Sequence, residues 1–69
     1  MILFLFQNVR TVIEAERLMV KAGLSVVVRP VPTKISSECG MCIQVSYIDT
    51  DFGCKILQEK GLIFKQIEQ

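Results

Sequence analysis

The run of residues 2–6, which reads ILFLF, is apolar at every position. Successive side chains of a strand point to opposite faces, so this run predicts a central strand that is apolar on both faces. In a two-layer α/β fold the helices cover only one of those faces. We therefore expect a second buried surface on the open face of the sheet, formed by a homo-oligomer or by docking on another protein.

A helix is expected after this strand. Thr11 and Glu14 fit a capping box that begins it, and it should end near Ala22. Gly23 is then expected to adopt the left-handed backbone conformation that ends a helix, with Leu24 making the apolar contact after it. At helical spacing, the face directed at the sheet comprises Val12, Ala15, Leu18, Met19 and Ala22.

Three strands and one helix are predicted in the remainder. Residues 24–31 are rich in valine and closed by prolines, residues 42–48 alternate between apolar and polar, and residues 62–67 form the last strand. The cluster 49–51 offers N-caps for a second helix that ends near Lys60, before Gly61. The pattern predicts one α+β domain over residues 1–69, a ferredoxin-like βαββαβ sandwich with antiparallel sheet order 4-1-3-2.

Composition and charge argue against several classes of function. Eight basic and seven acidic residues give a net charge of +1, which provides no electrostatic footprint for nucleic acid or an anionic membrane. The apolar run 2–6 is too short for a signal-peptide core or a membrane span. We expect a cytoplasmic protein with reduced thiols and no cofactor.

The polar connection over residues 30–42 carries the most distinctive chemistry, because a thiol beside glycine, hydroxyls and a cation can ionise. The odd count of three cysteines argues against a fully paired disulfide framework. Histidine is absent, which excludes cysteine–histidine dyads, serine–histidine–aspartate triads and mixed cysteine–histidine zinc sites within the chain. The candidate residues of this connection are Lys34, Ser36, Ser37, Cys39, Gly40 and Cys42.

In the predicted topology this connection lies near the start of the first helix. The partial positive charge of the helix N-terminus, together with Arg10 and Lys34, would favour Cys39 as a thiolate, while Glu38 opposes it. Cys42 is either a resolving thiol for Cys39 or a space-filling residue. The ordinary reading of Cys39, a small residue at a strand edge, stays open.

Two alternatives remain. A dimer could share two Cys-x-x-Cys pairs in a four-cysteine metal site. The chain could also be a non-catalytic interaction module that uses its apolar sheet face, with the cysteines incidental. Cys54, on the flank of the second helix, is expected to have no role.

The segment Pro30-x-Pro32 followed by Ser36-Ser37-x-Cys39-Gly40 resembles the small bacterial selenium/sulfur carrier-like proteins. The resemblance covers nearly the whole chain and includes Ala-Glu at positions 15 and 16. It implies that Cys39 carries sulfur or selenium as a persulfide or selenopersulfide, between donor and acceptor proteins.

Serine hydroxyls and loop amides would stabilise the terminal sulfur of such a group. This chain has Gln44 where members often have a basic residue. It also lacks the Cys-Pro-x-Pro signature of other small sulfur-transfer carriers. Because such transfer takes place between proteins, the sequence leaves open whether the chain is an enzyme.

Overall fold

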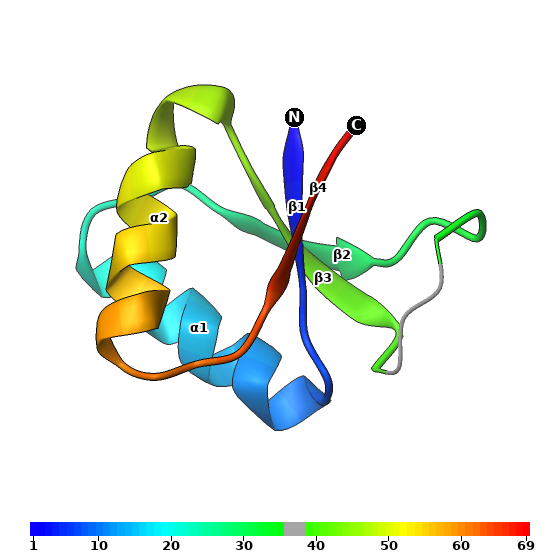
Figure 1. Ribbon diagram of the computed structural model, residues 1–69, viewed down its shortest axis with the longest axis horizontal. Helices are drawn as coiled ribbons and strands as arrows, with labels where there is room; N and C mark the ends of the chain where they lie inside the picture. Colours follow the sequence, from blue (N-terminus) through cyan, green and yellow to red (C-terminus); the bar gives the residue numbers. More distant parts are fainter. Residues whose placement is uncertain (36–38) are drawn as a thin grey trace.

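The computed structural model describes residues 1–35 and 39–69. Within them the element order is β1 (Ile2–Leu5), α1 (Val9–Lys21), β2 (Val27–Pro30), β3 (Met41–Val45), α2 (Tyr47–Glu59) and β4 (Lys65–Glu68). The strands form one sheet in the order β2-β3-β1-β4, and each neighbouring pair is antiparallel. Both helices lie on the same side of the sheet (Figure 1). The predicted ferredoxin-like sandwich and its strand order are confirmed.

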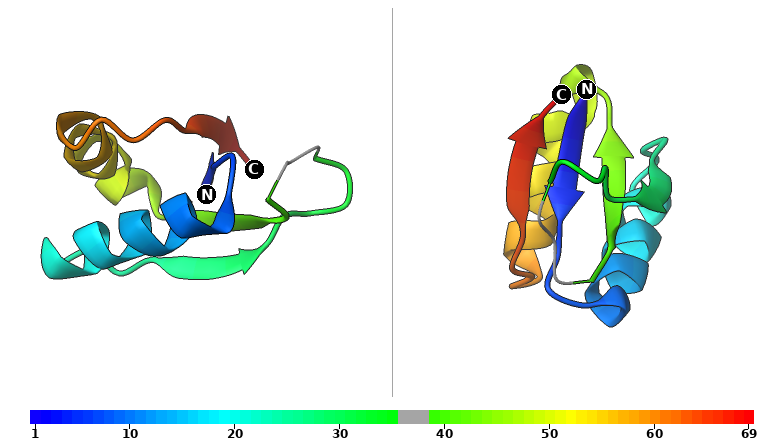
Figure 2. Two further views of the ribbon diagram at one scale, coloured as in Figure 1. Left: turned by 90° about the horizontal axis from the view of Figure 1, so that it is seen from below. Right: turned by 90° about the vertical axis from the view of Figure 1, so that its right-hand side faces the viewer.

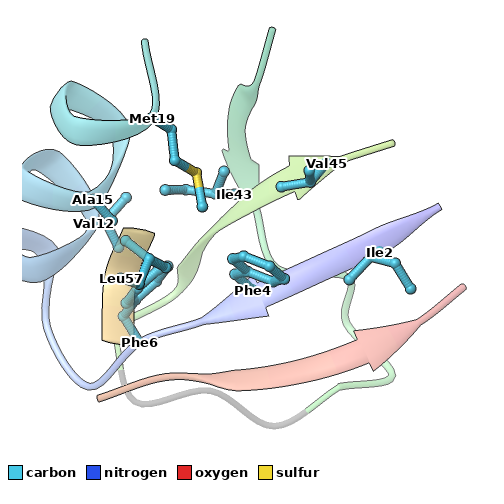
Figure 3. Close-up of a cluster of buried hydrophobic side chains, with 9 residues drawn as sticks. All are labelled: Ile2, Phe4, Phe6, Val12, Ala15, Met19, Ile43, Val45 and Leu57. Carbon is cyan, nitrogen blue, oxygen red and sulfur yellow. The ribbon is translucent and has the colours of Figure 1, made fainter. Parts of the chain in front are cut away.

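The main core lies between the sheet and the helices (Figure 3). Phe4 is fully buried at its centre and stacks on Phe64, with 5.1 Å between the ring centroids. Gly53 of α2 faces this core, where a Cβ would lie 3.3 Å from the Met19 side chain. The buried members of this helix-side core are Ile2, Phe4, Phe6, Val12, Ala15, Met19, Ile43, Val45 and Leu57.

Helix α1 begins earlier than the capping box predicts. Its N-cap is Asn8, whose side-chain oxygen accepts a hydrogen bond from the backbone N–H of Thr11 at 2.9 Å. Asparagine is among the best N-cap residues, and it places Thr11 inside the first turn. The predicted C-terminus is confirmed, because Gly23 has a φ of +94° and the N–H of Leu24 donates to the carbonyl of Met19 at 3.0 Å. Ala22, however, is exposed.

Helix α2 also begins before its predicted cap cluster. Ser46 is the N-cap, so Tyr47 belongs to the helix and the predicted strand 42–48 is too long. The register explains the difference, because Val45 already pairs with Ile2 at the start of β1, and β3 has almost no partner beyond it. The strands β2 and β4 are likewise shorter than the predicted segments 24–31 and 62–67. Gly61 follows the helix with a φ of +72°, as predicted.

The sheet face away from the helices is covered by the chain itself. Leu3 is fully buried there and Leu5 is 6% exposed, because Val31 and Ile35 of the β2–β3 connection pack against them together with Ile67. The first part of this connection, residues 31–35, lies on the opposite side of the sheet from the helices (Figure 2, right). Burial of Leu3 and Leu5 therefore needs no second copy, which corrects the expectation that this side of β1 lacks a cover. Homo-oligomerisation itself stays a prediction.

The cover over this face can be tested by comparing two substitutions. Leu3→Ala should lower the free energy of unfolding by about 2–5 kcal/mol, because it opens a cavity beneath the connection. Val27→Ala, on the same face but at a side chain that is 53% exposed, should cost about 0.5 kcal/mol or less. Urea denaturation of the two variants measures the difference. Equal losses would show that the connection does not cover Leu3 in solution.

Candidate functional site

The end of β1 meets the start of β3, where the cysteines of the polar connection lie. Cys42 pairs with Leu5 on one side and with Arg29 of β2 on the other. At the base of the connection, the N–H of Val31 donates to the carbonyl of Gly40 at 2.9 Å. The connection therefore begins and ends at the predicted end of the sheet, where β1 ends and the chain continues into α1.

Cys39 lies just outside the sheet with its sulfur against the backbone of β3. It is half-buried and packs against the helix-side core. Its Sγ–H donates to the carbonyl of Met41 at 3.0 Å, and the N–H of Met41 approaches the same sulfur at 3.5 Å. Gly40 has a φ of +76°, which lets the chain turn so tightly between these two residues. An amide N–H at this position would stabilise negative charge on the Cys39 sulfur.

Cys42 lies in different surroundings. It is fully buried with Leu3 and Leu5 on the face covered by the connection, and its Sγ–H points to the carbonyl of Pro30 at 4.0 Å. Burial raises the pKa of the Cys42 thiol, the positive charge of Arg29 lowers it, and the charge of Cys39 raises it; burial dominates. Cys42 is therefore a neutral thiol at neutral pH, within electrostatic reach of both other residues.

Arg29 is the residue that sequence reasoning missed. Its Nη1 donates to Oε1 of Gln44 at 2.7 Å, across the β2–β3 pair. Gln44 follows Cys42 by two positions and faces the same side of the sheet, so the guanidinium is fixed beside the buried thiol. Strand pairing provides the signal, because the hairpin register places Arg29 directly opposite Cys42. The family resemblance suggests a basic residue at position 44. This chain has a glutamine there, and its side chain accepts a hydrogen bond from Arg29.

Of the other predicted site residues, Arg10 and Lys34 are exposed. Ser36 and Ser37, the predicted hydroxyl donors, and Glu38 lie outside the described residues.

Cys54 belongs to the other side of the sheet. It packs against the helix-side core, and its Sγ–H donates to Oε1 of Gln66 at 3.0 Å. Burial, followed by the charge of Asp51, raises the pKa of the Cys54 thiol. These contacts show that Cys54 is partly buried and packed; that it has no functional role stays a prediction.

Within residues 1–35 and 39–69, no cluster of histidine, cysteine or acidic side chains is suited to hold a metal ion. A four-cysteine site shared by two copies would require Cys42 to reach the surface, whereas it is fully buried. Neither helix in this part of the chain is long and apolar enough to cross a membrane.

The difference between the two neighbouring thiols can be measured by alkylation. With iodoacetamide at pH 7.5, Cys42 should react at least about tenfold more slowly than Cys39, because burial blocks access and the raised pKa keeps the thiol protonated. Fragment-ion masses of the peptide that contains both cysteines, taken at successive times, give the two rates. Unfolding in urea should make the rates nearly equal; similar rates in the folded protein would contradict the burial of Cys42.

No curated protein and no solved structure gives a significant match to the chain. A family model does, and it is the one described as "Putative Se/S carrier protein-like". It matches residues 1–69, the full length of the sequence, and confirms the predicted family. The chain therefore belongs to the Se/S carrier protein-like family.

Proposed function

We propose that the protein carries sulfur or selenium as a persulfide or selenopersulfide on Cys39 and passes it from a donor to an acceptor protein. The observation that carries this proposal is the glycine turn that directs the N–H of Met41 at the Cys39 sulfur. Family membership supplies the class of cargo. The turn supplies a donor that stabilises an anionic sulfur at one accessible cysteine.

The transfer needs no external oxidant or reductant. In loading, the Cys39 thiolate attacks the outer sulfur of a persulfide on the donor; a new S–S bond forms on Cys39, and the donor cysteine leaves as a thiolate. In delivery, an acceptor thiolate attacks the outer sulfur on Cys39, and Cys39 leaves as a thiolate. In both steps the Cys39 sulfur is or becomes an anion, which is the state that the Met41 N–H favours.

Exposure and surroundings favour Cys39 over the other two thiols. Cys42 has no exposed surface, so a partner protein cannot reach it without movement of the connection. Cys54 has a raised pKa and is engaged by Gln66 on the helix side of the sheet. Cys39 is half-buried at the end of the sheet and lies next to a backbone donor.

The alternative of an interaction module depended on a bare apolar face. Leu3 and Leu5, the large side chains of that face of β1, are buried beneath Val31 and Ile35. The apolar surface that such a module would offer is therefore smaller than the sequence suggests, and no contact in the described structure favours this function.

Incubation of the reduced protein with a cysteine desulfurase and cysteine tests the proposal. One added sulfur atom should appear on Cys39, and Cys42→Ser should load as the parent does. Intact and peptide masses under non-reducing conditions provide the measurement. Cys54→Ser is the matched control and should load normally, whereas Cys39→Ser should not. Persistence of the label in Cys39→Ser would refute the assignment.

The turn at Gly40 can be tested against a second glycine of like conformation. Alanine at either Gly40 or Gly23 would meet no atom within 4 Å but would have to adopt a positive φ. Each substitution should destabilise the protein by about 1 kcal/mol. Only Gly40→Ala should also slow sulfur loading, by about fivefold, because it displaces the Met41 N–H from Cys39. Equal loading rates in the two variants would remove the turn from the mechanism.

A further inference from the structure

We propose that two copies of this chain associate through the β2 edge of the sheet and the adjoining flank of α1. A two-fold axis perpendicular to the sheet would pair β2 antiparallel with β2 of the second copy. Two features carry this inference: a sheet edge with apolar side chains toward the helix layer, and a helix flank that is complementary to itself. The inference goes beyond the proposed function and does not depend on it.

Strand β2 has backbone groups that face outward from the sheet. The N–H of Val31 donates to the carbonyl of Gly40, so these two residues form a hydrogen-bonded pair of the β2–β3 ladder. Because such pairs alternate along an antiparallel ladder, Val28 and Pro30 direct their backbone groups away from β3. In the described part of the chain, no strand pairs with β2 on that side. Val28 therefore presents an N–H and a carbonyl to a further strand, and Pro30 presents a carbonyl alone.

The two edges of the sheet differ in character. The β4 edge has a lysine at its start and a glutamate at its end, Lys65 and Glu68, and charged side chains on an edge strand discourage pairing with another chain. On the β2 edge, Val26 and Val28 are half-buried and pack against the helix-side core. Arg29, the charged residue of β2, is on the other face and is bonded to a glutamine of β3. A further strand is therefore expected on β2 rather than on β4.

Helix α1 adds an apolar flank beside this edge. The helix lies on the β2 side of the sheet, whereas α2 lies on the β4 side (Figure 2, right). Val9, Ile13 and Val20 share one flank of α1 by their helical spacing. The right-handed β1-α1-β2 crossover turns this flank toward β2, while Leu18 on the opposite flank is half-buried. Ile13 is 50% exposed and Val20 is 55% exposed, so association here would remove apolar surface from water.

This flank is complementary to itself. The axis that pairs β2 with β2 also makes the two α1 helices antiparallel neighbours, since both lie on the same face of the extended sheet. With the axis between positions 16 and 17, Ile13 falls opposite Val20 of the second copy, and Glu16 falls opposite Arg17 of the second copy. Apolar side chains then meet apolar ones and each acid meets a base, twice in the dimer. A second copy is therefore the occupant that both the apolar pattern and the charges fit.

This association leaves the Cys39 site open. Strand pairing centred on Val28 exchanges N–H···O bonds between the two copies of that residue, and it brings the N–H of Val26 to the outward carbonyl of Pro30. Cys39 lies beyond the Pro30 end of β2, because Pro30 pairs with Met41. The two-fold axis therefore places the two Cys39 residues at opposite ends of the extended sheet.

Sedimentation of the reduced full-length chain over a wide range of concentrations tests the interface. The mean mass should rise from 7.8 kDa toward twice that value. Ile13→Lys should raise the dissociation constant at least about tenfold, because an ammonium group would be buried against Val20 of the second copy. Ile48→Lys is the matched control, since it replaces an isoleucine of α2 that is 89% exposed, and it should leave the constant unchanged. Urea denaturation checks that both variants fold.

Charge reversal tests the two-fold pairing of the helices. Glu16→Arg and Arg17→Glu should each raise the dissociation constant about fivefold, because each variant places like charges together. The double variant brings opposite charges together again, so its dissociation constant should return to within about twofold of the parent value.

Amide hydrogen exchange tests the strand pairing. The N–H of Val28 is directed away from β3, so it should exchange slowly in the dimer and at least about tenfold faster in Ile13→Lys. The N–H of Arg29 is directed at β3 in both states, and its exchange should change little.

A chain that stays at 7.8 kDa at every concentration would overturn the proposal and leave the β2 edge to a strand of another protein. Three further results would also overturn it. These are a dimer that Ile48→Lys disrupts and Ile13→Lys does not, a double charge variant that associates no better than either single one, and a Val28 amide that exchanges equally fast in the parent and in Ile13→Lys.

Discussion

The antiparallel pairing of β1 with β3 places alternate side chains of β1 against two different covers. Phe4, opposite Ile43, faces the helices, while Leu5, opposite Cys42, faces the β2–β3 connection. Each buried side chain of this size contributes about 1.5–3 kcal/mol. A chain this short has few such contributions, so leaving either face of its central strand in water would forgo much of its stability. The position of the connection, and hence of both site cysteines, follows from this need.

The connection both covers one face of the sheet and positions the two cysteines. Ile35 and Val31 cover the sheet, which buries Cys42 and leaves it a neutral thiol. Past this cover the chain returns to the sheet through Gly40, and this turn leaves Cys39 at the end of the sheet beside the Met41 amide. Two thiols three positions apart thus differ in exposure and in hydrogen bonding. Of the two, only Cys39 can be reached by another protein without movement of the connection.

Sequence patterns predicted the element order, the strand order and both glycine helix ends, because each depends on local periodicity or on a backbone conformation that glycine adopts readily. They placed both helix starts too late, since several residues near each start are good N-caps, and tertiary register selected Asn8 and Ser46. Arg29 was missed for a related reason. Its position beside Cys42 depends on which β3 residue it opposes, and that register is a property of the hairpin rather than of either strand. The covered face was missed because nothing local shows that Ile35 returns to the sheet.

In the proposed carrier, the cargo must stay on Cys39 longer than the time needed to meet an acceptor, so a neighbouring thiol within reach would shorten its lifetime. Cys42 is buried with Leu3 and Leu5 on one face of the sheet, whereas Cys39 packs against the helix-side core. Burial also raises the pKa of the Cys42 thiol, which keeps it protonated at neutral pH. Separation and protonation both disfavour an attack by Cys42, and they therefore favour transfer of the sulfur to an acceptor protein.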